Sequence, residues 1–136
     1  MGGKRTFANA FRTGYYDQMT VTSEAVESLI KALSTHPSVT RDGAYFAPAT
    51  EARFHGLRPD TLTWDWCDRN SAERGLRAAL AYYDLDGQIV SVALSVASKQ
   101  VTEIELWRGD GTPILSVPSD GDVWEVVPGQ VYSPRA

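Results

Sequence analysis

Two acidic side chains and a tryptophan occur at every second position of one predicted strand: Glu103, Glu105 and Trp107. A strand directs alternate side chains to opposite faces, so these three share one face, with the two carboxylates roughly 7 Å apart. Two carboxylates at that separation could perform acid–base chemistry, although a polar solvent face explains them at least as well. Because an aromatic beside two carboxylates can form a binding patch, the three residues are candidate partner-binding residues, although the N-terminal aromatic segment could equally cover Trp107.

A second group of ionisable residues lies earlier in the chain. His55 falls on the polar face of a predicted strand beside Arg53, and Asp65 falls on the polar face of the next strand. Of the two histidines, His55 is the better candidate for a group that titrates near neutral pH. An exposed strand histidine accounts for it equally well, and His36, which follows a predicted helix, is expected to have a structural role. His55 and Asp65 therefore form a candidate ionisable site, with Glu103 as a third candidate.

The turns between strands are rich in aspartate. Asp84 and Asp86 flank a hairpin turn that ends at Gly87, and the pair Asp-Gly is a strong signal for such a turn. Turn chemistry explains these carboxylates better than a calcium loop, because the EF-hand spacing and its distant glutamate are missing. Asp84 and Asp86 are nevertheless assigned to the acidic partner-binding surface.

The chain contains none of the motifs that usually carry catalysis or cofactor binding. It lacks His-Glu-x-x-His, Cys-x-x-Cys, Gly-x-Ser-x-Gly and the P-loop. Gly109-Asp110-Gly111 matches only the first part of a dinucleotide-binding fingerprint, and it joins two predicted strands, as a hairpin turn does. We therefore expect no catalytic residues, no metal and no cofactor.

Composition restricts the compartment and the class of partner. The single cysteine, Cys67, excludes an internal disulfide, and neither a signal peptide nor a run of ~20 apolar residues is visible, so we expect a cytoplasmic protein without a membrane partner. The net charge is +2 over residues 1–59 and −6 over residues 60–136. This acidity disfavours nucleic acid and suits a basic protein partner. It could also serve only to keep the protein in solution.

Hydrophobic periodicity predicts one clear helix near the N-terminus. Residues 23–34 place apolar side chains at helical spacing, and Thr22 or Ser23 can cap the start. His36-Pro37 ends the helix, because the residue before proline avoids the helical region. Residues 1–20 are predicted to form an aromatic arm or a second, short helix, and residues 128–136 a tail.

Alternation between apolar and polar residues dominates the rest of the chain. Short strands are predicted over residues 44–47 and 52–56, and a longer one over 61–66. From Gly75 onwards an antiparallel meander is expected, with an edge segment over 114–117 and a last strand over 122–127. The 136 residues form a single domain of ordinary size. The predicted fold is α+β, with one or two helices packed on one face of the meander.

Part of the meander sequence also resembles a known family of domains. The run of residues 82–96, followed by 103–110, 113–115 and Pro118, resembles a family of small bacterial domains of unknown function. In that family an aspartate-glycine hairpin leads to a strand ending in Glu-x-Glu/Asp-hydrophobic-Trp-Lys/Arg-x-Asp. Such domains occur in variable genomic neighbourhoods that include polymorphic toxin loci. The resemblance implies a role linked to toxins and carries no catalytic residues with it.

Three functional hypotheses follow from these observations. The favoured one is a non-enzymatic immunity or antitoxin-like inhibitor that binds a toxin domain through an acidic, aromatic-containing sheet face. The second is a small-ligand-binding or hydrolase-like domain with a pocket under the helix. The third is a structural or accessory domain of a phage or secretion apparatus, which predicts a symmetric oligomer.

Overall fold

The structure is a computed structural model that describes residues 25–66, 75–118, 121–127, 129–130 and 132–134. The predicted N-terminal arm, the helix cap at Thr22 or Ser23, and Cys67 lie outside these ranges. The elements in chain order are α2 (Val26–Ser34), α3 (Pro37–Thr40), η2 (Arg41–Gly43), η3 (Ala49–Glu51), β1 (Arg53–Arg58), β2 (Thr61–Asp65), β3 (Gly75–Tyr83), β4 (Ile89–Ala97), β5 (Gln100–Trp107) and β6 (Trp124–Glu125).

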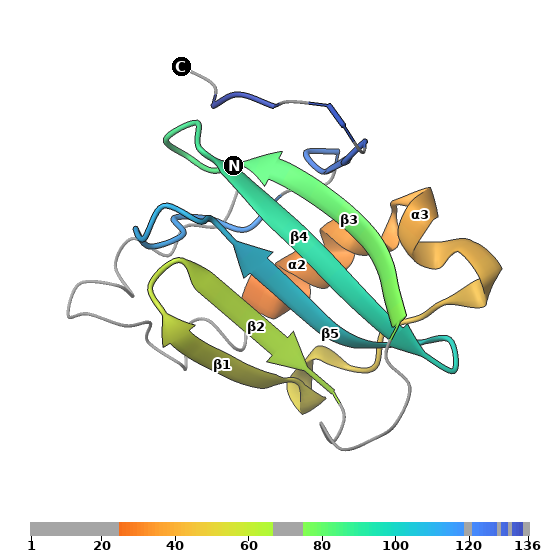
Figure 1. Ribbon diagram of the computed structural model, residues 1–136. Helices are drawn as coiled ribbons and strands as arrows, with labels where there is room; N and C mark the ends of the chain where they lie inside the picture. Colours follow the sequence, from red (N-terminus) through yellow and green to blue (C-terminus); the bar gives the residue numbers. More distant parts are fainter. Residues whose placement is uncertain (1–24, 67–74, 119–120, 128, 131, 135–136) are drawn as a thin grey trace.

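The six strands form one sheet in the order β1-β2-β5-β4-β3-β6 (Figure 1). Every pair of neighbouring strands is antiparallel, so the predicted α+β fold with an antiparallel meander is confirmed. The meander consists of β3, β4 and β5. The β1–β2 hairpin extends the sheet beside β5, and the short β6 extends it beside β3.

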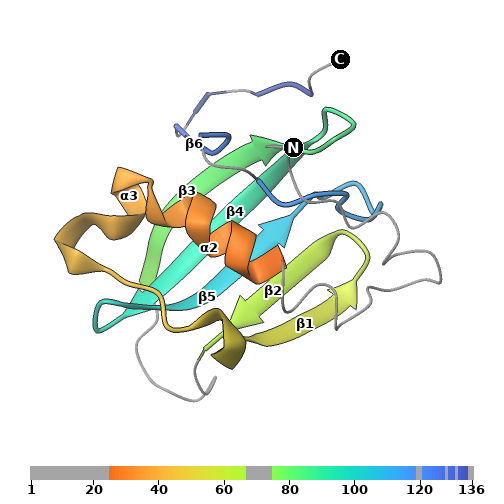
Figure 2. The ribbon, with the colours of Figure 1, turned by 180° about the vertical axis from the view of Figure 1, so that it is seen from behind.

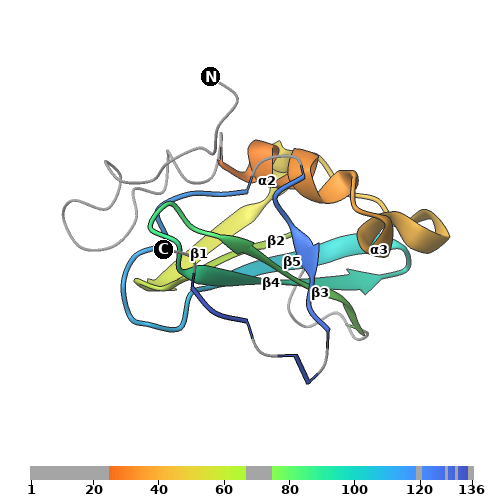
Figure 3. The same ribbon diagram turned by 90° about the horizontal axis from the view of Figure 1, so that it is seen from above.

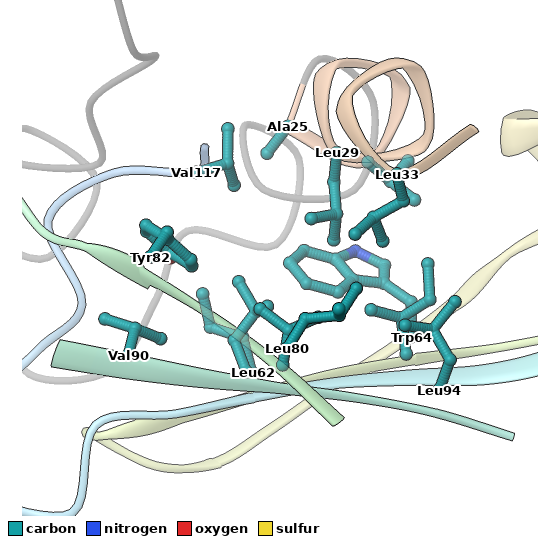
Figure 4. Packing of buried hydrophobic residues seen from close by; sticks show 14 of the residues in the cluster. Ala25, Leu29, Leu33, Leu62, Trp64, Leu80, Tyr82, Val90, Leu94 and Val117 are labelled. Atoms are coloured by element: carbon teal, nitrogen blue, oxygen red, sulfur yellow. The ribbon is translucent and has the colours of Figure 1, made fainter. Parts of the chain in front are cut away.

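Helix α2 lies across one face of the sheet, which we call the inner face (Figures 2 and 3). The helix is amphipathic, because Val26, Leu29 and Leu33 are buried whereas Glu27 and Lys31 are exposed. The side chains between helix and sheet form one continuous apolar layer (Figure 4). From the strands this layer includes Leu62, Trp64, Leu80, Tyr82, Val90, Val92, Leu94, Ile104 and Leu106.

His36 has a structural role at the junction of α2 and α3, where its side chain caps the start of α3. Its backbone N–H donates to Leu33 O at 3.0 Å, and its imidazole Nδ1 accepts from Ser38 N at 3.2 Å. Pro37 occupies the first turn of α3, where a missing N–H costs nothing. The His36-Pro37 pair therefore ends α2 and begins α3.

The segment predicted as an edge strand after β5 is a buried connection. Ile114, Ser116 and Val117 are fully buried, and Figure 4 shows Val117 between Tyr82 and Ala25. Tyr82 Oη donates to Ser116 O at 2.6 Å. Pro113 and Pro118 cannot donate to a strand ladder, and between them the Leu115 N–H donates to the side chain of Asp84 at 2.9 Å.

Two other predicted segments differ from regular strands. The predicted strand 44–47 is reduced to one parallel bridge between Tyr45 and Gln100. In the described part of the tail, Tyr132 folds back: its hydroxyl accepts from Val127 N at 3.0 Å, and its ring lies 6.1 Å from that of Trp124. The tail therefore contacts the β6 edge of the sheet.

Candidate partner-binding face

The face of the sheet opposite α2, here called the outer face, carries the predicted partner-binding residues of β5. Residues directly opposite each other in neighbouring strands point to the same face, so strand register gives the layout of this surface. Three rows cross the sheet, each written from β2 to β5 to β4: Asp65–Glu103–Ser95, Thr63–Glu105–Ala93 and Thr61–Trp107–Ser91. Glu103, Glu105 and Trp107 therefore share the outer face, as alternation predicted.

The β4 side chains beside these residues are short. Ser91 lies opposite Trp107 and Ala93 lies opposite Glu105; Ser91 is exposed and Ala93 half-buried. Trp107 is 50% exposed, which is unusual for so large an apolar side chain. The indole is thus exposed beside short β4 side chains, and Glu103 and Glu105 next to it are half-buried.

The Trp107 ring rests against Gly109. A Cβ atom added at Gly109 would lie 3.1 Å from Cζ2 of Trp107, which is too close for an unstrained contact. Gly109 also has φ +83°, a conformation that favours glycine. The turn after β5 therefore supports one side of the indole ring.

Glu105 is an anionic group in an unfavourable environment. Burial raises the pKa of Glu105, and the neighbouring charge of Glu103 raises it further. Within the described ranges the Glu105 carboxylate has no hydrogen bond or ion pair that would offset these effects. A cation supplied from outside would favour its ionised form.

The structure brings His55 and Asp65 together in the cluster Arg53–His55–Asp65. Arg53 lies directly opposite Asp65 in the β1–β2 ladder, and His55 lies opposite Thr63, so His55 reaches Asp65 diagonally. His55 Nε2 lies 2.7 Å from Asp65 Oδ2, and Arg53 Nε donates to Asp65 Oδ1 at 2.8 Å. The alternation of β1 and β2 identified the polar faces, whereas the pairing depends on register.

This cluster compensates a buried carboxylate. The Asp65 side chain is 1% exposed, against 33% for His55 and 55% for Arg53. A buried charge requires partners, and Arg53 supplies a permanent one. When the imidazole proton is on Nε2, that N–H donates a hydrogen bond to Asp65 and Nδ1 is left as an acceptor. The geometry could thus hold a histidine for proton transfer, or could simply satisfy Asp65.

The aspartates of the turns converge on Arg108, forming the Arg108 cluster with Asp84, Asp86 and Asp110. Arg108 Nη1 lies 2.8 Å from Asp84 Oδ2, and Nη2 lies 2.6 Å from Asp86 Oδ2 and 2.9 Å from Asp110 Oδ2. The Arg108 side chain is 6% exposed. Burial lowers the Arg108 pKa, but hydrogen bonds to Asp110, Asp86 and Asp84 outweigh burial and raise it.

Asp84 is consequently removed from the partner-binding set. Its side chain is fully buried, and besides Arg108 it accepts from Leu115 N at 2.9 Å and from Ser116 Oγ at 2.8 Å. No outside molecule can reach this carboxylate. The hairpin position suggested exposure, but the buried segment 113–118 covers it.

Asp86 and Asp110 remain partly accessible, with side chains 44% and 32% exposed. The Arg108 guanidinium lowers the pKa of Asp86 and lowers that of Asp110 to about 2. Both carboxylates are engaged with Arg108, but one guanidinium faces three carboxylates, so the Arg108 cluster keeps a net negative charge and Asp86 remains part of the acidic surface. The role of Arg108 was not predicted; the sequence signal for it is that three aspartates and this arginine all lie in turns.

Neither a metal centre nor a bilayer-spanning helix occurs in the described ranges. No group of three or more His, Cys, Asp or Glu side chains there is arranged to hold a metal. No helix there combines the length and the apolar character that crossing a membrane requires.

The chain matches no family model, no curated protein and no solved structure.

Proposed function

We propose that this chain is a non-enzymatic binding protein of the immunity type, which inhibits a toxin domain in the cytoplasm. The observation that carries the proposal is the row Glu103, Glu105 and Trp107 on the outer face of β5. Exposed aromatics beside charged groups are common anchors of protein interfaces. The resemblance of the meander to small domains found at toxin loci supports the same function.

The charges of the outer face favour a basic partner. Asp65 pairs with Arg53 and contacts His55, and Asp86 and Asp110 share the single guanidinium of Arg108. Glu105, whose pKa is raised by burial and by Glu103, has no such partner among the described residues, so a partner's cation would favour its ionised form. An acidic surface of this kind can block a basic active-site cleft through complementary potentials.

A ligand pocket under the helix receives little support. Apolar side chains of α2 and of the strands lie between the helix and the sheet (Figure 4), whereas register places His55, Asp65 and Glu103 on the opposite face. The 2.7 Å contact between His55 and Asp65 is the feature that an enzyme hypothesis would still use. Loss of a catalysed reaction on substitution of His55 by glutamine would favour that alternative.

The proposal is tested by purifying the chain together with the larger protein encoded beside it, whose C-terminal domain is the expected toxin. We expect a stable complex, and we expect Glu105→Lys to weaken it about tenfold or more, because like charges then meet at the interface. Glu27→Lys is the matched control, since Glu27 is exposed on α2 and the substitution changes net charge identically.

Two outcomes would contradict this function. One is the absence of a complex between the two wild-type proteins. The other is an equal weakening by Glu105→Lys and Glu27→Lys, which would show that only net charge matters. A symmetric oligomer of the chain alone, measured by light scattering, together with no complex, would instead favour the structural or accessory role.

A further inference from the structure

Glu105 and Trp107 together have the features of a site for one particular side chain. The two residues lie two positions apart on the outer face of β5, with their Cα atoms roughly 7 Å from each other. Glu105 offers a carboxylate without a compensating cation among the described residues. Trp107 offers an indole that is 50% exposed. A planar cation of sufficient length could contact both.

The surroundings leave room for such a group. On β4, Ser91 lies opposite Trp107 and Ala93 lies opposite Glu105, so the adjacent side chains are among the shortest available. On the other side of β5, Thr61 and Thr63 of β2 lie opposite Trp107 and Glu105, and Gly109 contacts the Trp107 ring, since a Cβ atom there would lie 3.1 Å from it. One side of the indole is thus held by the turn while its exposed part is available.

We infer that this surface is an arginine-recognition site, which binds an arginine side chain of the partner between the Glu105 carboxylate and the Trp107 ring. The inference rests on the proposed function and names the partner chemistry of the same face. A guanidinium can form two parallel hydrogen bonds to a carboxylate and stack on an aromatic ring at the same time. A lysine ammonium lacks this planar geometry, so the site discriminates between the two cations.

Among the described residues, no arginine pairs with Glu105. The arginines of the two other acidic clusters, Arg53 and Arg108, are engaged with Asp65 and with the turn aspartates. Glu105 instead has Glu103 as its charged neighbour. Among the described side chains, Glu105 is therefore a carboxylate without a cation, and it lies beside the exposed indole of Trp107.

The test uses two short peptides with blocked ends, tetra-arginine and tetra-lysine, titrated into the full chain and followed by two-dimensional NMR. We expect tetra-arginine to shift the Trp107 indole N–H and the β5 amides, with a dissociation constant about fivefold lower than that of tetra-lysine. Equal affinities for the two peptides, or shifts centred on Asp86 and Asp110, would overturn the arginine site.

Two variants separate charge from stacking. Glu105→Gln removes the carboxylate charge, and Ser91→Tyr fills the space opposite Trp107 without changing any charge. Each is expected to weaken tetra-arginine binding about fivefold or more, whereas Glu27→Gln on α2 is expected to leave it unchanged. Retention of full binding by either outer-face variant, in a chain whose spectrum shows it folded, would contradict the inference.

The two proposals fail in distinguishable ways. Arginine-selective binding by the chain without a complex in the co-purification would overturn the toxin-inhibitor function alone. A complex with the toxin domain, together with no preference for tetra-arginine, would overturn the arginine site alone.

Discussion

Gly109 illustrates how a single residue can set the shape of the outer face. Its φ of +83° turns the chain after β5, and its missing side chain makes room for the ring of Trp107. Gly111 in the same turn has a similar φ of +80°, but nothing lies within 4 Å of a Cβ atom added there. Substitutions at the two glycines therefore distinguish the cost of backbone strain, which both share, from the cost of steric contact with Trp107, which only Gly109 has.

Gly109→Ala is expected to destabilise the protein more than Gly111→Ala. Both substitutions force alanine into a left-handed conformation at a cost of about 1 kcal/mol. Only Gly109→Ala also displaces the indole, which should add on the order of 1 kcal/mol and shift the Trp107 indole N–H resonance. Urea denaturation measures the free energies of unfolding. Equal values for the two variants would show that the contact between Gly109 and Trp107 does not contribute to stability.

At the scale of elements, the Arg108 cluster connects segments that are distant in sequence. Asp84 and Asp86 belong to the β3–β4 turn, whereas Arg108 and Asp110 belong to the turn after β5. Asp84 also binds the buried segment through Leu115 and Ser116. The cluster holds two turns and one irregular segment at the same end of the sheet.

Arg108→Met is expected to cost about 3–5 kcal/mol of unfolding free energy, because it leaves the buried Asp84 carboxylate without its cation. The comparison is Arg58→Met, at an exposed position of β1, for which a change within about 0.5 kcal/mol is expected. Both are measured by urea denaturation. A cost below about 1 kcal/mol for Arg108→Met would mean that the hydrogen bonds from Leu115 and Ser116 suffice for Asp84.

At the scale of the whole molecule, the two faces of the sheet have different roles in stability. The inner face contributes an apolar layer, while the two groups with opposite pKa shifts, Glu105 and Asp110, lie on the outer face and in the turn after β5. Their effects on stability have opposite signs. The lowered pKa of Asp110 stabilises the fold at neutral pH, whereas the raised pKa of Glu105 destabilises it.

The pH dependence of stability follows from these shifts. The pKa of Asp110 is about 2 in the folded state against 3.8 ordinarily, so its stabilising contribution is complete above pH 3.8 and is lost as pH falls through about 2. We expect Asp110→Asn to make the loss of stability between about pH 4 and pH 2 shallower, as measured by urea denaturation at several pH values. An unchanged slope would show that Asp110 contributes no stability through Arg108.

Much of the fold and part of the site could be predicted from local patterns. The alternation of β5 is sufficient to place Glu103, Glu105 and Trp107 on one face, because successive strand side chains always point in opposite directions. The stripe of α2 and the Asp-Gly turn after β3 are equally local, since they depend on residues a few positions apart. Sequence by itself therefore determined helix α2, the faces of the main strands and the meander, but not α3 or the irregular segments 44–47 and 113–118.

The tertiary structure decided everything that depends on which distant segments meet. It places β2 beside β5, pairs His55 with Asp65 through the β1–β2 register, and buries Asp84 beneath segment 113–118 around Arg108. These contacts join segments whose separation along the chain carries no periodic signal. They arise only when the apolar faces of the hairpins and of α2 are buried together, and this packing selects one register and one set of neighbours.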